Sequence, residues 1–185
     1  MIRDYGRHTT QRTLLLTVVV AAVVTVTTGV ALAAALSCTP GIACYGGDGD
    51  DTFAGTVGEE FVYGNGGDDV LSSKGGHDSL IGDGQADSSL DGDDTLSGGS
   101  GPDNLFGYGG NDRLRGGGGN DQINAVEGGG SNPGKDTVKA GKGNDVVIAN
   151  DGHKDTIDCG SGKDEVYFDK GMDEVAANCE KRHAV

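Results

Sequence analysis

Basic residues are scarce in this chain. Its 185 residues include 14 lysines and arginines against 29 aspartates and glutamates, so the net charge is −15 at pH 7. Nucleic acids and anionic lipid surfaces are bound through basic surfaces, so this balance argues against direct binding to either. Five basic residues of the second half form no obvious row that could line a groove: Arg113, Arg115, Lys139, Lys142 and Lys163. The five tyrosines are scattered and form no stacking platform.

Sequence motifs of catalysis are also absent. The chain has no H-E-x-x-H zinc motif and no G-x-S-x-G nucleophile elbow, and its four histidines are scattered. No C-x-x-C pair offers a redox or zinc site. The acidic residues follow a repeat and do not form an isolated acid/base pair. We therefore expect no enzymatic activity in this chain.

Glycine, by contrast, is abundant, and much of it belongs to a nine-residue repeat. Over residues 46–176 the chain repeats the unit G-G-x-G-x-D-x-U-x, in which U is a large apolar residue. Thirteen copies begin at Gly46, Gly55, Gly64, Ser73, Ser89, Gly98, Gly107, Gly116, Ser131, Ala140, Asn150, Cys159 and Phe168. A low-complexity tract rich in glycine and aspartate would not keep three positions in phase through so many copies, which argues against disorder.

Three positions of the repeat are nearly constant. The sixth is acidic in every copy: Asp51, Glu60, Asp69, Asp78, Asp94, Asp103, Asp112, Asp121, Asp136, Asp145, Asp155, Asp164 and Asp173. The eighth is apolar in every copy: Phe53, Val62, Leu71, Leu80, Leu96, Leu105, Leu114, Ile123, Val138, Val147, Ile157, Val166 and Val175. The fourth is glycine except in the copy that begins at Asn150, where it is His153. Insertions at residues 82–88 and 125–130 and a one-residue slip at Ala149 break the register, and we expect the insertions to form surface loops.

Each copy encodes a turn followed by a short strand. Glycine adopts positive φ without steric cost, and the last three residues alternate polar, apolar and polar or small, as a strand does. Burying one apolar side chain stabilises the fold by about 1.5–3 kcal/mol, whereas fixing the backbone costs about 1–2 kcal/mol per residue. The repeat therefore needs a second source of stability. Ca²⁺ prefers oxygen ligands and would also remove the repulsion between stacked carboxylates, so we predict that the chain folds on calcium.

Copies such as residues 98–106 and 116–124 resemble the haemolysin-type (RTX) calcium-binding nonapeptide repeat. The resemblance implies an all-β fold, namely a parallel β-roll (a two-sheet solenoid) with several Ca²⁺ ions in its turns. It also implies that turn carbonyls and acidic side chains two copies apart hold each ion. The implied metal ligands are the thirteen residues of position six, paired as Asp51–Asp69, Glu60–Asp78, Asp94–Asp112, Asp103–Asp121, Asp136–Asp155, Asp145–Asp164 and Asp155–Asp173. Pairs across the two insertions depend on those insertions looping out.

Single members of this set have an alternative role. An aspartate at the end of a turn can cap that turn through a hydrogen bond to the backbone, without any metal. Glu60 departs from the repeat, and its extra methylene would displace the carboxylate. His153 and the slip at Ala149 disturb the copy in which Asp155 lies.

Residues 1–33 resemble a secretory signal peptide. Arg3, Arg7 and Arg12 precede an apolar run at residues 14–36, and residues 31–33 fit a small-x-small cleavage site. The alternative is an uncleaved helical membrane anchor that reaches residue 36. For an exported chain with four cysteines we expect disulfides Cys38–Cys44 and Cys159–Cys179. They would close end caps at residues 34–45 and 177–185 of the 46–176 solenoid.

The sequence therefore predicts a secreted, extracellular or cell-surface module that binds calcium and has no catalytic domain. Its expected partners are calcium ions and an extracellular or cell-surface partner that the sequence does not identify, with membrane contact only through an uncleaved N-terminus. One alternative is an extracellular enzyme, for instance one acting on carbohydrate, that uses a groove on the solenoid. Another is an ice- or surface-binding solenoid, which needs a regular outward threonine ladder that position seven of the repeat does not supply.

Overall fold

The computed structural model describes residues 34–36, 38–39, 41–84, 90–126 and 134–185. These residues fall within one compact unit, Ala31–Val185. The predicted signal or anchor segment, residues 1–33, lies outside the described residues. Among the residues that are described, none forms a helix long and apolar enough to cross a membrane.

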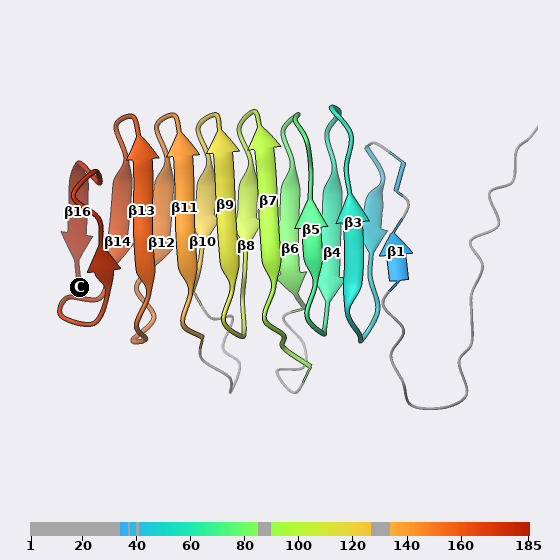
Figure 1. Ribbon diagram of the computed structural model, residues 1–185, viewed down its shortest axis with the longest axis horizontal. Helices are drawn as coiled ribbons and strands as arrows, with labels where there is room; N and C mark the ends of the chain where they lie inside the picture. Colours follow the sequence, from blue (N-terminus) through green and yellow to red (C-terminus); the bar gives the residue numbers. More distant parts are fainter. Residues whose placement is uncertain (1–33, 37, 40, 85–89, 127–133) are drawn as a thin grey trace, which may run out of the picture. The chain divides into compact units, whose positions relative to one another are not determined.

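The described chain forms two parallel sheets of eight strands each (Figure 1). We call them the odd sheet and the even sheet, after the numbers of their strands. The odd sheet contains β1 (Ala34–Leu36), β3 (Asp51–Ala54), β5 (Val70–Ser72), β7 (Thr95–Ser100), β9 (Arg113–Gly118), β11 (Thr137–Lys142), β13 (Thr156–Ser161) and β15 (Glu174–Val175). The even sheet contains β2 (Ala43–Tyr45), β4 (Phe61–Asn65), β6 (Ser79–Asp83), β8 (Asn104–Phe106), β10 (Gln122–Asn124), β12 (Val146–Ala149), β14 (Glu165–Phe168) and β16 (Lys181–Ala184).

The chain alternates between the sheets, so one odd and one even strand make one turn of a solenoid. Each strand pairs in parallel with the strand two places along the chain, as β9 does with β7 and β11. The predicted all-β, two-sheet parallel solenoid is therefore confirmed. Two repeat copies make one turn, and residues two copies apart become neighbours across strands.

The apolar eighth position of the repeat forms the core between the sheets. Twelve of its thirteen residues are at most 2 % exposed, and Val175 is partly buried at the end of the stack. Within a sheet these residues pair directly, as Leu71 does with Leu96 and Leu105 with Ile123. Because one face of each strand is buried and the other is open, the side chains on either side of position eight point outward.

The solenoid continues beyond the predicted repeat at both ends. Leu36 of β1 pairs with Phe53, and Cys44 of β2 pairs with Val62. At the other end Arg182 of β16 pairs with Val166, where the repeat would place an apolar residue. Both predicted disulfides are present, Cys38–Cys44 and Cys159–Cys179, with Cα–Cα distances of 5.6 and 5.2 Å. The residues expected to form caps thus include edge strands of the two sheets.

The two insertions and the one-residue slip lie slightly later in the chain than we predicted from the sequence. Asp83 is still in β6, where it pairs with Asn65, and the buried Ala125 donates its N–H to the carbonyl oxygen of Ile148 at 2.9 Å. Ala149 is also buried, in β12, and pairs with Phe168. All the extra residues therefore follow the end of an even strand, in turns that lead to the odd sheet.

The slip also changes which residue takes the glycine position of its turn. Gly152 has a φ of 90°, a left-handed conformation that favours glycine, whereas His153 is not among the residues with positive φ. The expectation that His153 replaces the fourth-position glycine was therefore wrong. The turn between Ala149 and Asp155 simply has one more residue than a turn without an insertion.

We predict that shortening an inward side chain lowers the free energy of unfolding more than shortening an outward side chain of the same strand. We expect Ile157→Ala to lower the free energy of unfolding by about 2–5 kcal/mol, because it leaves a cavity in a close-packed core. Its neighbour Thr156 is exposed, so Thr156→Ala should change that free energy by no more than about 0.5 kcal/mol. Urea unfolding of both variants with calcium present measures the difference. Equal effects would contradict the assignment of inward and outward faces.

Candidate metal centre

The acidic sixth position of each copy lies at the end of a turn, at or just before the first residue of a strand. Stacking of the turns lines these residues up in two ladders. The odd ladder, which precedes the odd strands, contains Asp51, Asp69, Asp94, Asp112, Asp136, Asp155 and Asp173. The even ladder contains Glu60, Asp78, Asp103, Asp121, Asp145 and Asp164. The strands of the two sheets run in opposite directions in Figure 1, so the ladders follow opposite edges.

Backbone hydrogen bonds join the members of each ladder. The N–H of each residue donates to a carboxylate oxygen of the next member, as Asp103 does to Asp121 and Asp155 to Asp173, both at 2.9 Å. The bonds also cross the insertions: Asp69 donates to Asp94 at 2.8 Å, and Asp112 to Asp136 at 2.8 Å. The structure therefore brings together every pair predicted from the spacing, as well as the pairs that depended on the insertions looping out.

The even ladder has one more member, which the sequence pattern did not indicate. The N–H of Asp164 donates to Oε2 of Glu180 at 2.9 Å. Glu180 comes directly before β16, as every ladder residue comes at or just before its strand. It was missed because it follows Asp164 by 16 residues and because Arg182 occupies the apolar position after it. Its place before the final strand is the one signal that could have found it.

The second oxygen of most ladder carboxylates is buried and has no hydrogen-bond partner. This holds for Glu60, Asp69, Asp78, Asp94, Asp103, Asp112, Asp121, Asp145, Asp155 and Asp164, all at most 2 % exposed. In Asp173, at the end of the odd ladder, the second oxygen accepts the N–H of Asp169 at 2.7 Å. A buried polar group without a partner costs free energy, and an anionic one costs more. The interior of each ladder therefore needs a counter-charge.

Backbone carbonyls lie beside these oxygens. A methyl group built on Gly64 would contact Oδ2 of Asp69 and would lie 2.6 Å from the carbonyl oxygen of Gly82. A methyl group on Gly116 would likewise contact Oδ2 of Asp121 and lie 2.6 Å from the carbonyl oxygen of Ala140. The absence of a side chain at these glycines lets a carboxylate and a carbonyl of the next turn approach the same stretch of backbone closely. Such an oxygen-only surrounding suits a hard cation such as Ca²⁺.

Burial raises the pKa of nine ladder carboxyl groups, because water no longer solvates their charged form; they are Asp69, Asp94, Asp103, Asp112, Asp121, Asp145, Asp155, Asp164 and Asp173. For most of the ladder the effect of burial is the largest, and repulsion from neighbouring ladder carboxylates adds to it. The pKa rises to about 6 for Asp103, about 7 for Asp69, Asp121 and Asp155, about 9 for Asp94 and about 10 for Asp112. Without a cation, the folded ladders therefore favour protonated carboxyl groups.

The fifth position of the repeat provides a contrast. On the odd edge Asp68 donates its N–H to Asp50 at 3.1 Å, and Asp93 to Asp68 at 2.9 Å. These carboxylates are exposed, and hydrogen bonds from Asn111 lower the pKa of Asp93. They accept a backbone N–H of the adjacent turn while the rest of the carboxylate faces solvent. The buried sixth position does not fit the role of a turn cap, because a cap satisfies only one of its two oxygens.

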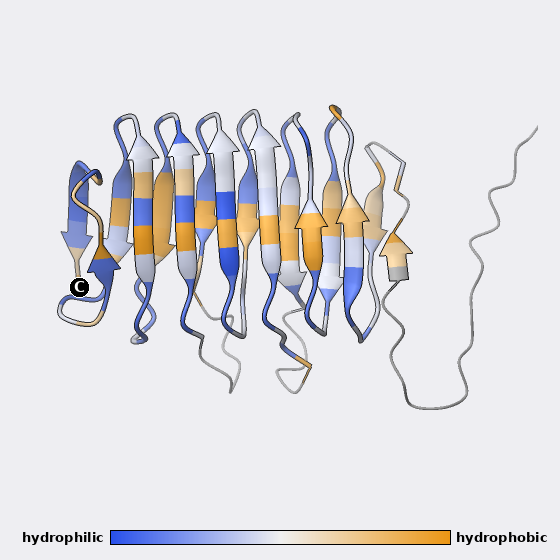
Figure 2. Cartoon of the chain, viewed as in Figure 1, coloured by the Kyte–Doolittle hydropathy of each residue, from blue (hydrophilic) through white to orange (hydrophobic). Residues whose placement is uncertain are grey.

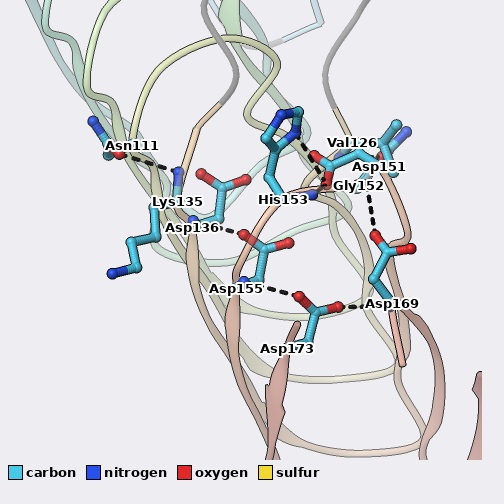
Figure 3. A network of polar contacts seen from close by, with 11 residues as sticks. Asn111, Val126, Lys135, Asp136, Asp151, Gly152, His153, Asp155, Asp169 and Asp173 are labelled. Atoms are coloured by element: carbon cyan, nitrogen blue, oxygen red, sulfur yellow. Dashed lines mark hydrogen bonds and ion pairs between the residues drawn. The ribbon is translucent and has the colours of Figure 1, made fainter. Parts of the chain in front are cut away.

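The two disturbed copies keep their place in the ladders. The N–H of Glu60 donates to Asp78 at 2.8 Å, while its Oε1 accepts from the hydroxyl of Thr56. Figure 3 shows the turn with the extra residue. There the N–H of Asp136 donates to a carboxylate oxygen of Asp155 at 2.8 Å, and the N–H of Asp155 donates to one of Asp173 at 2.9 Å.

The extra residue changes the surroundings of the ladder in that turn. The carboxylate of Asp151 accepts the N–H of His153 at 2.9 Å, and that of Asp169 accepts the N–H of Gly152 at 2.6 Å (Figure 3). The carboxylates of Asp151 and Asp169 thus lie in the same turn as the slip, which does not interrupt the ladder.

Comparison with known families agrees with this geometry. The model of the RTX calcium-binding nonapeptide repeat (4 copies) matches residues 45–80, 54–88, 89–123 and 130–166. These matches cover more than half of the chain, so the protein belongs to the RTX calcium-binding repeat family and is a β-roll repeat module. Searches of curated proteins and of solved structures returned no match.

Neighbouring carboxylates of a ladder would share an ion with backbone carbonyls. Within the described ranges, no group of three or more His, Cys, Asp or Glu side chains is arranged to hold a metal by itself. Calcium accepts carbonyl oxygens readily, so it fits a set of ligands that combines carboxylates with carbonyls.

The raised pKa values predict an unusual pH dependence for the calcium-free chain. A carboxyl group whose pKa is higher in the folded state contributes stability that is complete below its unfolded pKa, near 3.8. That contribution is lost as the pH rises through the folded values, from about 6 for Asp103 to about 10 for Asp112. We expect the calcium-free chain to be more stable at pH 5 than at pH 7.5, as measured by circular dichroism and urea unfolding. Higher stability at pH 7.5 would contradict this.

An isosteric substitution tests one rung of a ladder, by which we mean one of its carboxylate residues. Asp121→Asn keeps an oxygen that can accept the N–H of Asp103 but removes the buried negative charge. We expect calcium affinity at the affected rung to fall about 10-fold or more, because an interaction with a charged group contributes about 1.5–3 kcal/mol. Calorimetric calcium titration measures this. Asp158→Asn removes the same charge from the exposed face of β13 and should leave the titration unchanged.

Proposed function

We propose that this protein is an extracellular calcium-binding module whose β-roll forms when calcium binds. The observation that carries the proposal is the row of buried carboxylate oxygens without a hydrogen-bond partner, such as those of Asp94, Asp112 and Asp121. A chain that folds into this arrangement at neutral pH must neutralise them, and calcium outside the cell is available to do so. The thirteen acidic residues of position six and Glu180 are the proposed ligands.

Calcium binding and folding are coupled in this proposal because the ligands of each ion come from different turns of the solenoid. Each proposed ion uses side chains from two turns, for example Asp103 and Asp121, which are neighbours only in the folded solenoid. The unfolded chain therefore has no preformed site, and the free energy of binding becomes free energy of folding. Each turn contributes only two inward residues at the apolar position, so packing alone is a weak source of stability.

Two features support an extracellular location. The disulfides Cys38–Cys44 and Cys159–Cys179 persist in oxidising surroundings. Weak calcium sites also fill outside cells, where calcium is roughly millimolar, and stay empty in the cytosol. An N-terminal secretory signal would then deliver a chain that stays unfolded until it is exported.

We propose a structural or interaction role rather than catalysis. The repeat accounts for nearly all described residues, and its acidic residues are engaged in the ladders. A carbohydrate-active enzyme that uses a groove on the solenoid is the alternative, and it would need an acid/base pair outside the ladders. Turnover of an acidic polysaccharide by the calcium-loaded protein would favour that alternative.

The proposal is tested by circular dichroism with calcium and with chelator at pH 7.5. We expect the strand signal to be present in millimolar calcium and to be largely lost in chelator. It should return when calcium is added back. Magnesium at the same concentration serves as the control and should restore little of the signal, because it demands a rigid octahedral site and dehydrates reluctantly. Unchanged strand content in chelator would sink the proposal.

A further inference from the structure

The outer face of the odd sheet carries a cluster of cations that the linear sequence does not reveal. Arg113 and Arg115 point outward from β9, and Lys139 points outward from the neighbouring β11. The register places Lys139 directly opposite Arg115. Figure 2 shows the corresponding hydrophilic bands in the middle of the odd sheet. The sequence-based view that these residues form no row was wrong for these three, which we call the basic cluster.

The basic cluster is only partly balanced by neighbouring carboxylates: Asp93 lies near enough to Arg113 for that cation to help lower the pKa of Asp93. Arg115 and Lys139 are exposed, and neither forms an ion pair or a side-chain hydrogen bond with any other described residue. Asp158 lies opposite Lys139 on the other side, and its carboxylate also accepts from Asn178 at 2.6 Å and from the N–H of Gly160 at 3.1 Å. Like charges directly opposite each other destabilise a sheet. The repulsion between Arg115 and Lys139 is therefore offset only in part, by the charge of Asp158 beside Lys139.

Small hydroxyl side chains surround the basic cluster. Arg113 lies between Thr95 on β7 and Thr137 on β11, and Arg115 lies beside Ser97. Thr156 continues the row beyond Thr137. The cluster thus combines three cations with neutral hydrogen-bonding groups, and no aromatic side chain lies among these cross-strand neighbours.

We propose that this face binds an acidic polysaccharide, with Arg115 and Lys139 contacting sugar carboxylates and the neighbouring hydroxyls contacting sugar hydroxyl groups. Charge complementarity carries the choice of ligand. The side chains stand on an open sheet face, whereas sites for small molecules are concave, so an extended polymer fits better. A protein partner would call for aromatic anchors at the centre of the patch. Nucleic acid has a higher charge density and would be repelled by the rest of this acidic chain.

The inference rests on the proposed function in one respect, because the face exists only when calcium has folded the solenoid. β9 and β11 come from turns more than 20 residues apart in the chain, and only stacking makes Arg115 and Lys139 neighbours. Calcium also neutralises the carboxylates of both edges, which would otherwise repel an anionic polymer. Binding should therefore require calcium.

The test is fluorescence anisotropy with a labelled glucuronic acid hexasaccharide and the calcium-loaded protein, with circular dichroism on the same samples. We expect saturable binding that weakens with added salt and that falls at least about fivefold in the double variant Arg115→Gln/Lys139→Gln. The matched control, Lys163→Gln/Lys170→Gln, removes two exposed positive charges elsewhere and should bind as the unmodified protein does. An uncharged hexasaccharide should not bind.

Four results would overturn the inference. A folded protein that does not bind the acidic hexasaccharide refutes it, as does equal loss of binding in the control variant. Preferential binding of single-stranded DNA, or self-association that the double variant abolishes, would assign the cluster to another partner and so also refute it. If instead circular dichroism shows the same strand content with and without calcium while the hexasaccharide still binds, the proposed function fails and the basic cluster stands.

Discussion

The structure depends on like-charged carboxylates that stacking forces together. A parallel solenoid places equivalent residues of successive turns at adjacent strands, and here the sixth residue of the repeat is acidic in every copy. The resulting ladders are buried, each rung accepts one backbone N–H, and most rungs keep a second oxygen without a partner. Such an arrangement is unfavourable for an isolated chain at neutral pH and favourable around hard cations. The fold and the proposed need for metal therefore follow from the same arrangement of carboxylates.

This constraint explains where the chain tolerates change. The two insertions and the single extra residue all follow an even strand and precede a carboxylate of the odd ladder. Asp94, Asp136 and Asp155 nevertheless keep their hydrogen bonds to the rungs on either side. Extra length in a turn can leave as a loop, whereas a shift of one residue within a strand would move the core residues to the outer face. The ladder and the core are thus fixed by the strands and not by turn length.

The nine-residue period was enough to predict the short strands and the core residues, and the resemblance that it carries implied the two-sheet fold and the neighbours within each ladder. Both disulfides were expected separately, from an even number of cysteines in an exported chain. The predictions that were wrong or incomplete concern segments in which the nine-residue period is interrupted. The sequence alone could not show whether Ala149 or a turn residue absorbs the slip, since that choice depends on burial of Ala149 against the core. Glu180 escaped notice because its copy is shortened and Arg182 breaks the apolar pattern.

The basic cluster escaped notice for a related reason. Arg115 and Lys139 lie 24 residues apart, which is not a multiple of the nine-residue period, because the chain between them contains the six extra residues of the second insertion. Outward positions are also free of the constraints that hold the core and the ladders, so nothing in the repeat itself indicates their chemistry. The repeat accordingly specifies the scaffold and its edges. What distinguishes this module from another built on the same repeat lies in the outward residues of its two faces.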